Sequence, residues 1–158
     1  MSTREALDTA LAPLCATVAG LDLSDPTVAV TALDRAHPVG SLEPVRSLLF
    51  QAREQGWITP REAGPTCLFG RVAKPSHATS GMSIDAVDME GEGAEHTHPQ
   101  GEVSLCYAVS GDPRFDGYGP GWVVLPPGSH HTPTVTGGRM LIVYFLPDGA
   151  VAWGPKKG

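Results

Sequence analysis

The segment EHTHPQGE occupies residues 95–102, and PPGSHH follows at residues 126–131. Side chains alternate between the two faces of a β-strand, so His96 and His98 are expected on the same face. Glu102 shares their parity if the chain has no bulge in between. These two segments therefore predict that several groups able to bind a metal converge on one side of a sheet.

A second strand that follows the Pro-Pro-Gly turn can bring a further histidine opposite this face. Three imidazoles and one carboxylate suit Mn, Fe, Co, Ni or Zn and leave coordination positions for water or substrate. Spacing alone leaves open whether His130 or His131 is the last ligand; we favour His131. The alternative is that these histidines only pack or face solvent. We predict one divalent transition metal ion, of open identity, bound by His96, His98, Glu102 and His131.

The chain around these segments changes texture near residue 62. Residues 1–62 hold three of the 19 glycines and one of the six histidines. From residue 63 onward, short apolar or alternating runs are separated by Gly and Pro, which is typical of an antiparallel β-sandwich or barrel. We predict a helical segment over 1–62 and a β-barrel domain over 63–158, with strands near residues 67–72, 82–89, 103–109, 122–125 and 139–146.

Three helices are expected in the first segment. Ser2 and Glu5 form a capping box before apolar residues at helical spacing, and Gly20 ends the run. Asp25 followed by Pro26 predicts the start of a second helix that runs to about Ala36. A third is expected from Ser41 to Gly56. No side chain in these helices is identified as a candidate for the chemistry.

Composition narrows the class of partner. The net charge of −6 and the pI near 5.4 leave no basic surface for nucleic acid or an anionic membrane. The three cysteines are widely spaced and odd in number, which fits a reducing compartment, and no apolar run is long enough to cross a bilayer. We expect a soluble cytoplasmic protein that acts on a small molecule.

The two histidine segments resemble the motifs of the cupin superfamily. The first motif has the form His-x-His, three or four residues, then Glu; the second has Pro-x-Gly, two residues, then His. Residues 96–102 and 126–131 match both. This resemblance implies a conical antiparallel β-barrel, or double-stranded β-helix.

A narrower resemblance extends over most of residues 65–150. The chain is similar to the 4-hydroxylaminobenzoate lyase family at Phe69 to Pro75, His96 to Glu102, Phe115 to Gly117, Gly121 to Val124, Pro126 to Ser129 and Pro133 to Arg139. Members of that family convert 4-hydroxylaminobenzoate and water to protocatechuate and ammonia in nitroaromatic degradation. The resemblance implies a metal-dependent lyase with a small aromatic substrate.

That reaction would require a cationic side chain to bind the substrate carboxylate, a surface to bind the ring and a group that transfers protons. Arg71 is the first choice for the carboxylate because a guanidinium binds it in two places; Lys74, Arg114 and Arg139 are further candidates. Phe69, Trp122, Tyr144 and Phe145 are candidates for ring stacking. Tyr107, Tyr144 and Glu95 are candidates for acid or base. The substrate-binding prediction names Arg71, Lys74 and Trp122, and the catalytic prediction names Glu102, Tyr144 and His130.

The alternation of side chains along residues 102–109 indicates which of them face the expected cavity. Ser104, Cys106 and Ala108 share the face of Glu102, so small side chains are expected to leave room for a ligand, whereas Tyr107 is expected on the opposite face.

Two other functions stay open: an Fe(II) dioxygenase acting on an aromatic ring, and a cupin that binds a small ligand without catalysis. We also predict a homodimer, in which the helices pack on the barrel or across the interface.

Overall fold

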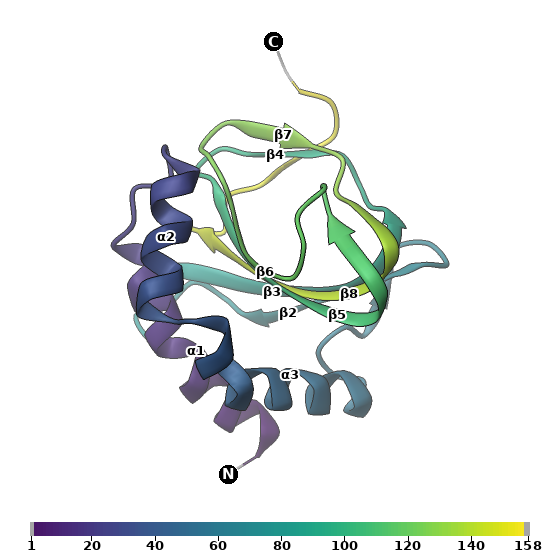
Figure 1. Ribbon diagram of the computed structural model, residues 1–158, viewed down its shortest axis with the longest axis horizontal. Helices are drawn as coiled ribbons and strands as arrows, with labels where there is room; N and C mark the ends of the chain where they lie inside the picture. Colours follow the sequence, from purple (N-terminus) through teal and green to yellow (C-terminus); the bar gives the residue numbers. More distant parts are fainter. Residues whose placement is uncertain (1, 157–158) are drawn as a thin grey trace.

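The computed structural model describes residues 2–156, and its first part is helical (Figure 1). The helices are α1 (Thr3–Ala19), α2 (Pro26–Ala36) and α3 (Glu43–Gln55), with a 3-10 turn over Val39–Leu42 before α3. The Ser2 capping box forms as predicted, and Gly56 ends α3 in the left-handed conformation, with φ of 80°. Among residues 2–156, no helix combines the length and apolar character needed to cross a membrane.

The third helix begins two residues later than predicted. Ser41 lies inside the 3-10 turn, where its hydroxyl donates to the Pro38 carbonyl at 2.7 Å instead of capping α3. Leu42 occupies the N-cap position and makes no side-chain capping bond. The serine was misassigned because the same hydroxyl can satisfy a preceding turn as well as a following helix.

The strands make two antiparallel sheets. Their bounds are β1 (Arg61–Glu62), β2 (Cys67–Ala73), β3 (Met82–Glu92), β4 (His96–His98), β5 (Glu102–Phe115), β6 (Gly121–Leu125), β7 (Ser129–His131), β8 (Thr134–Pro147) and β9 (Ala152–Trp153). The larger sheet has the order β1-β2-β3-β8-β5-β6, and the smaller has the order β7-β4-β9. The prediction of a mainly β, antiparallel chain preceded by helices is confirmed.

The sheet starts within the segment that was predicted to be helical. Arg61 and Glu62 pair with β2, so β1 precedes the predicted boundary at residue 62. The predicted positions of the longer strands are right, but β5 and β8 extend well beyond them. Both continue past the paired glycines Gly111 and Gly138, which have a β-bulge on either side. Glycine marks bulges as well as turns, which is why it suggested earlier strand ends.

Each long strand has one face toward the helices and one toward the interior between the two sheets. On β5, Val103, Leu105 and Tyr107 pack with the helices in one apolar core, whereas Cys106 belongs to a second core inside the barrel. The parity predicted for residues 102–109 is therefore confirmed. In Figure 1, α1, α2 and α3 lie outside the larger sheet, and β4 and β7 lie across the interior from it.

A buried ion-pair network fastens α3 to the sheet. Asp88, on the helix-facing side of β3 and 2% exposed, accepts hydrogen bonds from Nε of Arg53 at 2.7 Å and from Nε of Arg139 at 2.6 Å. Arg139 also donates to the Asp88 carbonyl at 3.0 Å. Arg139, an initial candidate for substrate binding, is thus occupied by a structural contact on the outer face of the sheet.

Candidate metal centre

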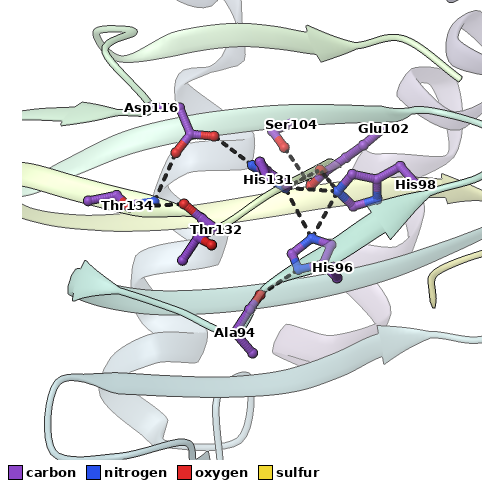
Figure 2. A network of polar contacts seen from close by, with 9 residues as sticks. All are labelled: Ala94, His96, His98, Glu102, Ser104, Asp116, His131, Thr132 and Thr134. Atoms are coloured by element: carbon purple, nitrogen blue, oxygen red, sulfur yellow. Dashed lines mark hydrogen bonds and ion pairs between the residues drawn. The ribbon is translucent and has the colours of Figure 1, made fainter. Parts of the chain in front are cut away.

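Four of the predicted site residues converge in the barrel interior (Figure 2). Nε2 atoms of His96 and His98 lie 2.9 Å apart, and each lies 3.0 Å from Nε2 of His131. Oε2 of Glu102 lies 2.6 Å from Nε2 of His98 and 3.9 Å from Nε2 of His131. The structure therefore brings His96, His98, Glu102 and His131 together, from β4, β5 and β7.

Strand register explains this convergence. His96 is paired with His131 across β4 and β7, so their side chains project from the same face of the smaller sheet. His98 is two residues further along β4 and shares that face. The turn after β4 places Gly101 in the left-handed conformation, with φ of 86°, and its N–H donates to the His98 carbonyl at 3.1 Å. This turn directs β5 back so that Glu102 meets the imidazoles.

Two of the imidazoles have their other nitrogen fixed by an acceptor. Nδ1 of His96 donates to the Ala94 carbonyl at 2.7 Å, and Nδ1 of His131 donates to Oδ2 of Asp116 at 2.6 Å, as Figure 2 shows. In the neutral rings, each Nε2 is left as a bare lone pair that points to the centre of the cluster. Burial, with smaller contributions from His98 and His131, lowers the pKa of His96 and favours its neutral form.

This donor set fits a metal ion. Two bare imidazole nitrogens 3.0 Å apart, such as those of His96 and His131, do not hydrogen-bond to each other and repel unless a cation lies between them. Nitrogens bound at right angles to one ion, about 2.1 Å from it, lie about 3.0 Å apart. Oε2 of Glu102 is fully buried and lies 2.6 Å from Nε2 of His98, inside the same cluster. The cluster is therefore a convergent set of nitrogen and oxygen atoms of the kinds that bind a divalent metal ion.

Glu102 is held as a carboxylate. Its Oε1 accepts a hydrogen bond from the Ser104 hydroxyl at 2.9 Å. Burial, the largest single influence, acts to raise its pKa, but His98, His131 and Ser104 together outweigh it and lower the pKa of Glu102. The ionised form, which is the metal-binding form, is favoured at neutral pH.

His130 does not belong to this cluster. It projects from the face of β7 opposite to that of His131. There its Nε2 lies 2.9 Å from a carboxylate oxygen of Glu95, and its Nδ1 lies 2.7 Å from the Thr97 hydroxyl. Neither His130 nor Glu95 lines the cavity described below. Their predicted roles in catalysis are not supported by this placement, because adjacent residues of a strand point in opposite directions.

A cavity of about 1000 Å³ opens from the cluster to the surface. Its buried end holds His98 and Glu102, which are 1% and 4% exposed. Four exposed cationic side chains also line it, and the residues are Arg4, Arg61, Arg71 and Lys74. The cavity thus joins a buried set of metal-binding donors to a positively charged rim.

Arg71, a predicted substrate-binding residue, and Tyr144, a predicted catalytic residue, both line this cavity. Nε of Arg71 donates to Oδ1 of Asp85 at 2.9 Å, and no hydrogen bond among the described residues uses its Nη atoms. Tyr144 is paired with Ser104 on β5 and with Asp85 on β3. Burial first, and then the carboxylates of Asp85 and Glu102, raise the pKa of the Tyr144 phenol, so it carries its proton at neutral pH.

Trp122 lies elsewhere. It is on the helix-facing side of β6, 6% exposed, and its indole donates to the His37 carbonyl at 3.0 Å. Its ring packs 6.4 Å from that of Phe145 in the core between helices and sheet. The structure thus excludes it from the cavity, because Val123 and not Trp122 has interior parity on β6. Phe145 and Tyr107 lie in the same outer core.

Several residues that line the cavity or contact the metal-binding cluster escaped the sequence analysis. Arg4 and Trp57 come from the helical segment, which was expected to carry no chemistry, and the Arg4 guanidinium lies 4.3 Å above the Trp57 ring. Asp116 was noted only inside a motif of family resemblance, since Asp before Gly is typical of a turn. Trp153 lies near the chain end on a strand of two residues. None of these positions has a local pattern that separates it from an ordinary surface residue.

Two antiparallel sheets around a cavity, with three imidazoles and one carboxylate at its buried end, define a cupin-type protein. The particular family follows from sequence comparison. Residues 14–153 match the family described as PnbB, 4-hydroxylaminobenzoate lyase, and the chain belongs to that family. The narrower resemblance at its motifs is thus confirmed, and the protein is an enzyme of this family.

Two relatives carry the same name. The chain is 31% identical over 132 residues to the 4-hydroxylaminobenzoate lyase of Nocardioides sp. (strain LMS-CY), covering 77% of this chain and 78% of the relative. It is 29% identical over 126 residues to the 4-hydroxylaminobenzoate lyase of Pseudomonas putida, covering 69% of this chain and 72% of the relative.

Solved structures similar to this fold include two cupins. An RmlC-like cupin protein from Ralstonia eutropha JMP134 aligns with a TM-score of 0.44 and 16% identity, over 63% of this chain and 66% of that chain. A cupin-like protein from Thermotoga maritima MSB8 aligns with a TM-score of 0.42 and 12% identity, over 61% of this chain and 90% of that chain.

Proposed function

We propose that this protein is a metal-dependent lyase that converts 4-hydroxylaminobenzoate and water to protocatechuate and ammonia. The observation that carries the proposal is the cavity, which joins a cluster of four metal-binding side chains to a cationic rim. A para-substituted benzoate has its carboxylate and its hydroxylamine at opposite ends of the ring. The two ends of the cavity offer the chemistry that the two ends of such a substrate require.

His96, His98, Glu102 and His131 would hold one divalent ion, with Fe, Mn, Zn, Ni and Co all compatible with these donors. Such an ion supplies Lewis acidity toward the hydroxylamine oxygen or a water molecule. The net reaction breaks the N–O bond and the ring C–N bond, forms two ring C–O bonds and releases the nitrogen as ammonia. In the overall balance, the hydroxylamine oxygen and one water supply the two oxygens, and the nitrogen is reduced as the ring is oxidised. It needs no external oxidant or reductant.

At the rim, Arg71 is proposed to bind the substrate carboxylate. Asp85 holds its Nε, which orients the guanidinium and leaves the two Nη groups to donate in parallel to a carboxylate. Lys74 lines the same cavity and adds a second positive charge there. This arrangement orients the ring so that its other end faces the buried donors.

Tyr144 is proposed as the general acid. Its phenol keeps its proton at neutral pH and lines the cavity on the strand next to Glu102. A protonated phenol can donate to the oxygen that leaves nitrogen as the N–O bond breaks. We propose that Glu102 acts as a metal ligand, because the contacts of its carboxylate are those to His98, His131 and Ser104.

The test is anaerobic incubation of the metal-loaded protein with 4-hydroxylaminobenzoate, followed by assays for ammonia and protocatechuate. Equal amounts of both products without oxygen uptake support the lyase. Oxygen consumption with ring opening would indicate the dioxygenase that similar donors permit, and binding without either product would indicate a non-catalytic cupin. The His98→Ala variant is the matched inactive control. The homodimer and the cytoplasmic location stay predictions.

A further inference from the structure

Trp153 is an exposed aromatic residue that lines the same cavity. It lies in β9, the edge strand that pairs with β4, and the register places it directly opposite His96. Its ring centroid is 5.0 Å from that of His96, with the ring planes inclined by 59°. The C-terminal segment therefore sets an indole beside the metal-binding cluster; this segment runs next to β4 in Figure 1.

Trp153 is 64% exposed, which is unusual for so large an apolar residue in the wall of a cavity. The two other tryptophans are already partnered. Trp57 donates to the Gln55 side chain at 3.0 Å and is covered by Arg4, and Trp122 donates to the His37 carbonyl. Among residues 2–156, no hydrogen bond to the Trp153 indole is found. Its free face is available to a ligand.

A flat ring suits this position. Aromatic pairs prefer offset or edge-to-face arrangements with centroids 4.5–7 Å apart, and such a pair adds stabilisation beyond the area that it buries. A substrate ring lying on Trp153 would remain next to His96, and the indole would also keep water away from that side of the cluster. On the outer side of the sheet, Trp122 offers no such surface.

We propose that Trp153 is the residue on which the aromatic ring of the substrate stacks, and that it contributes to specificity for benzoates. This inference rests on the proposed function for the identity of the substrate. It assigns the ring-binding role to the C-terminal strand, whereas the carboxylate-binding role belongs to β2 and the metal-binding donors to β4, β5 and β7.

The experiment compares Trp153→Ala and Trp153→Phe with the metal-loaded wild-type protein. Trp153→Ala is expected to raise KM for 4-hydroxylaminobenzoate about tenfold and to weaken protocatechuate binding, measured by calorimetry, by a similar factor. Trp153→Phe should restore both to within about threefold. Metal content should stay stoichiometric, because the indole is no metal ligand. Tyr118→Ala is the control, since Tyr118 is an exposed aromatic residue that does not line the cavity.

Unchanged KM and protocatechuate affinity in Trp153→Ala would overturn the inference. It would also be overturned by loss of metal or by a fall in kcat alone, either of which would mean that the indole only supports His96. If Trp153→Ala converted a dimer to a monomer in sedimentation without changing affinity, Trp153 would be an interface residue instead. A wild-type protein without lyase activity would reject the proposed function, and protocatechuate binding would still decide the role of Trp153.

Discussion

Asp116 binds the side chain of His131 and the backbone of Thr134 with the two oxygens of one carboxylate. Its Oδ2 accepts from Nδ1 of His131 at 2.6 Å, and its Oδ1 accepts from the Thr134 N–H at 2.9 Å. The Asp116 N–H in turn donates to the Thr134 carbonyl at 2.9 Å. His131 comes from a three-residue strand, so this carboxylate fixes a ligand that its own strand holds weakly.

Asp116→Ala is therefore expected to weaken metal binding by about 10- to 100-fold, because the His131 ring loses its orientation and its tautomer. Asp116→Asn keeps an acceptor oxygen and should fall between Ala and wild type. Competition with a chelator measures both. Asp112→Ala removes an exposed acid from β5, the strand that ends just before Asp116, and is the control. Equal metal affinity in Asp116→Ala and Asp112→Ala would mean that His131 needs no such support.

The ligand set predicts which histidines matter. His98→Ala and Glu102→Ala should each lose stoichiometric metal in elemental analysis, since each removes one of four donors. His130→Ala should retain it, because that ring faces Glu95 on the other side of β7. Loss of metal from His130→Ala alone would place the ligands elsewhere.

The buried ion pairs of Asp88 are expected to contribute to the stability of the contact between α3 and the sheet. Asp88→Ala leaves the guanidiniums of Arg53 and Arg139 without their shared partner and should reduce the free energy of unfolding by about 3 kcal/mol. Urea denaturation measures this change. Glu43→Ala is the matched control, because its ion pair with Arg46 spans 3.7 Å at the surface and should contribute less than about 0.5 kcal/mol. Similar losses in the two variants would contradict a structural role for the buried network.

The turn before Glu102 is expected to exclude a side chain at position 101. A Cβ at this position would lie 2.9 Å from the Leu125 carbonyl oxygen, and the φ of 86° disfavours any L side chain. Gly128→Ala is the control, because its φ of 81° carries the same backbone cost with nothing within 4 Å of the added carbon. Gly101→Ala should be less stable than Gly128→Ala by about 1–3 kcal/mol in urea denaturation. Equal stability of the two variants would show that the turn can shift to accommodate the added Cβ without loss of stability.

Cys106 is predicted to be inert although it lies in the barrel core. Burial, followed by the charges of Glu102 and Asp116, raises the pKa of its thiol far above neutral, so little thiolate forms. It should not react with a thiol-specific disulfide reagent in the native protein and should react fully in urea. Cys106→Ser should keep its metal. Rapid labelling of Cys106 in the native protein, identified by mass spectrometry, would mean that the reagent reaches this thiol on β5 through the cavity.

Several features of this protein were determined by its sequence alone. The helix boundaries at Ser2, Asp25 and Gly56 follow from capping and turn chemistry, which depends on neighbours within a few residues. The shared face of His96 and His98, and the opposite face of Tyr107, follow from the alternation of a strand. Glu102, which was expected to share that face by parity, instead reaches the imidazoles through the Gly101 turn between β4 and β5. Such local rules predicted the ligand types, the helical start and the antiparallel class of the fold.

Only the tertiary structure decided which of two adjacent histidines points inward. His131 meets His96 because β7 pairs with β4 in one register, and a shift by one residue would have brought His130 inward instead. Register also placed Trp122 outside and Trp153 beside His96. The antiparallel pairing of β5 with β8, which runs as far as Phe115 and Val135, brought Asp116 next to Thr134 and His131. These contacts join segments far apart in the chain, and their geometry depends on packing that no local pattern records.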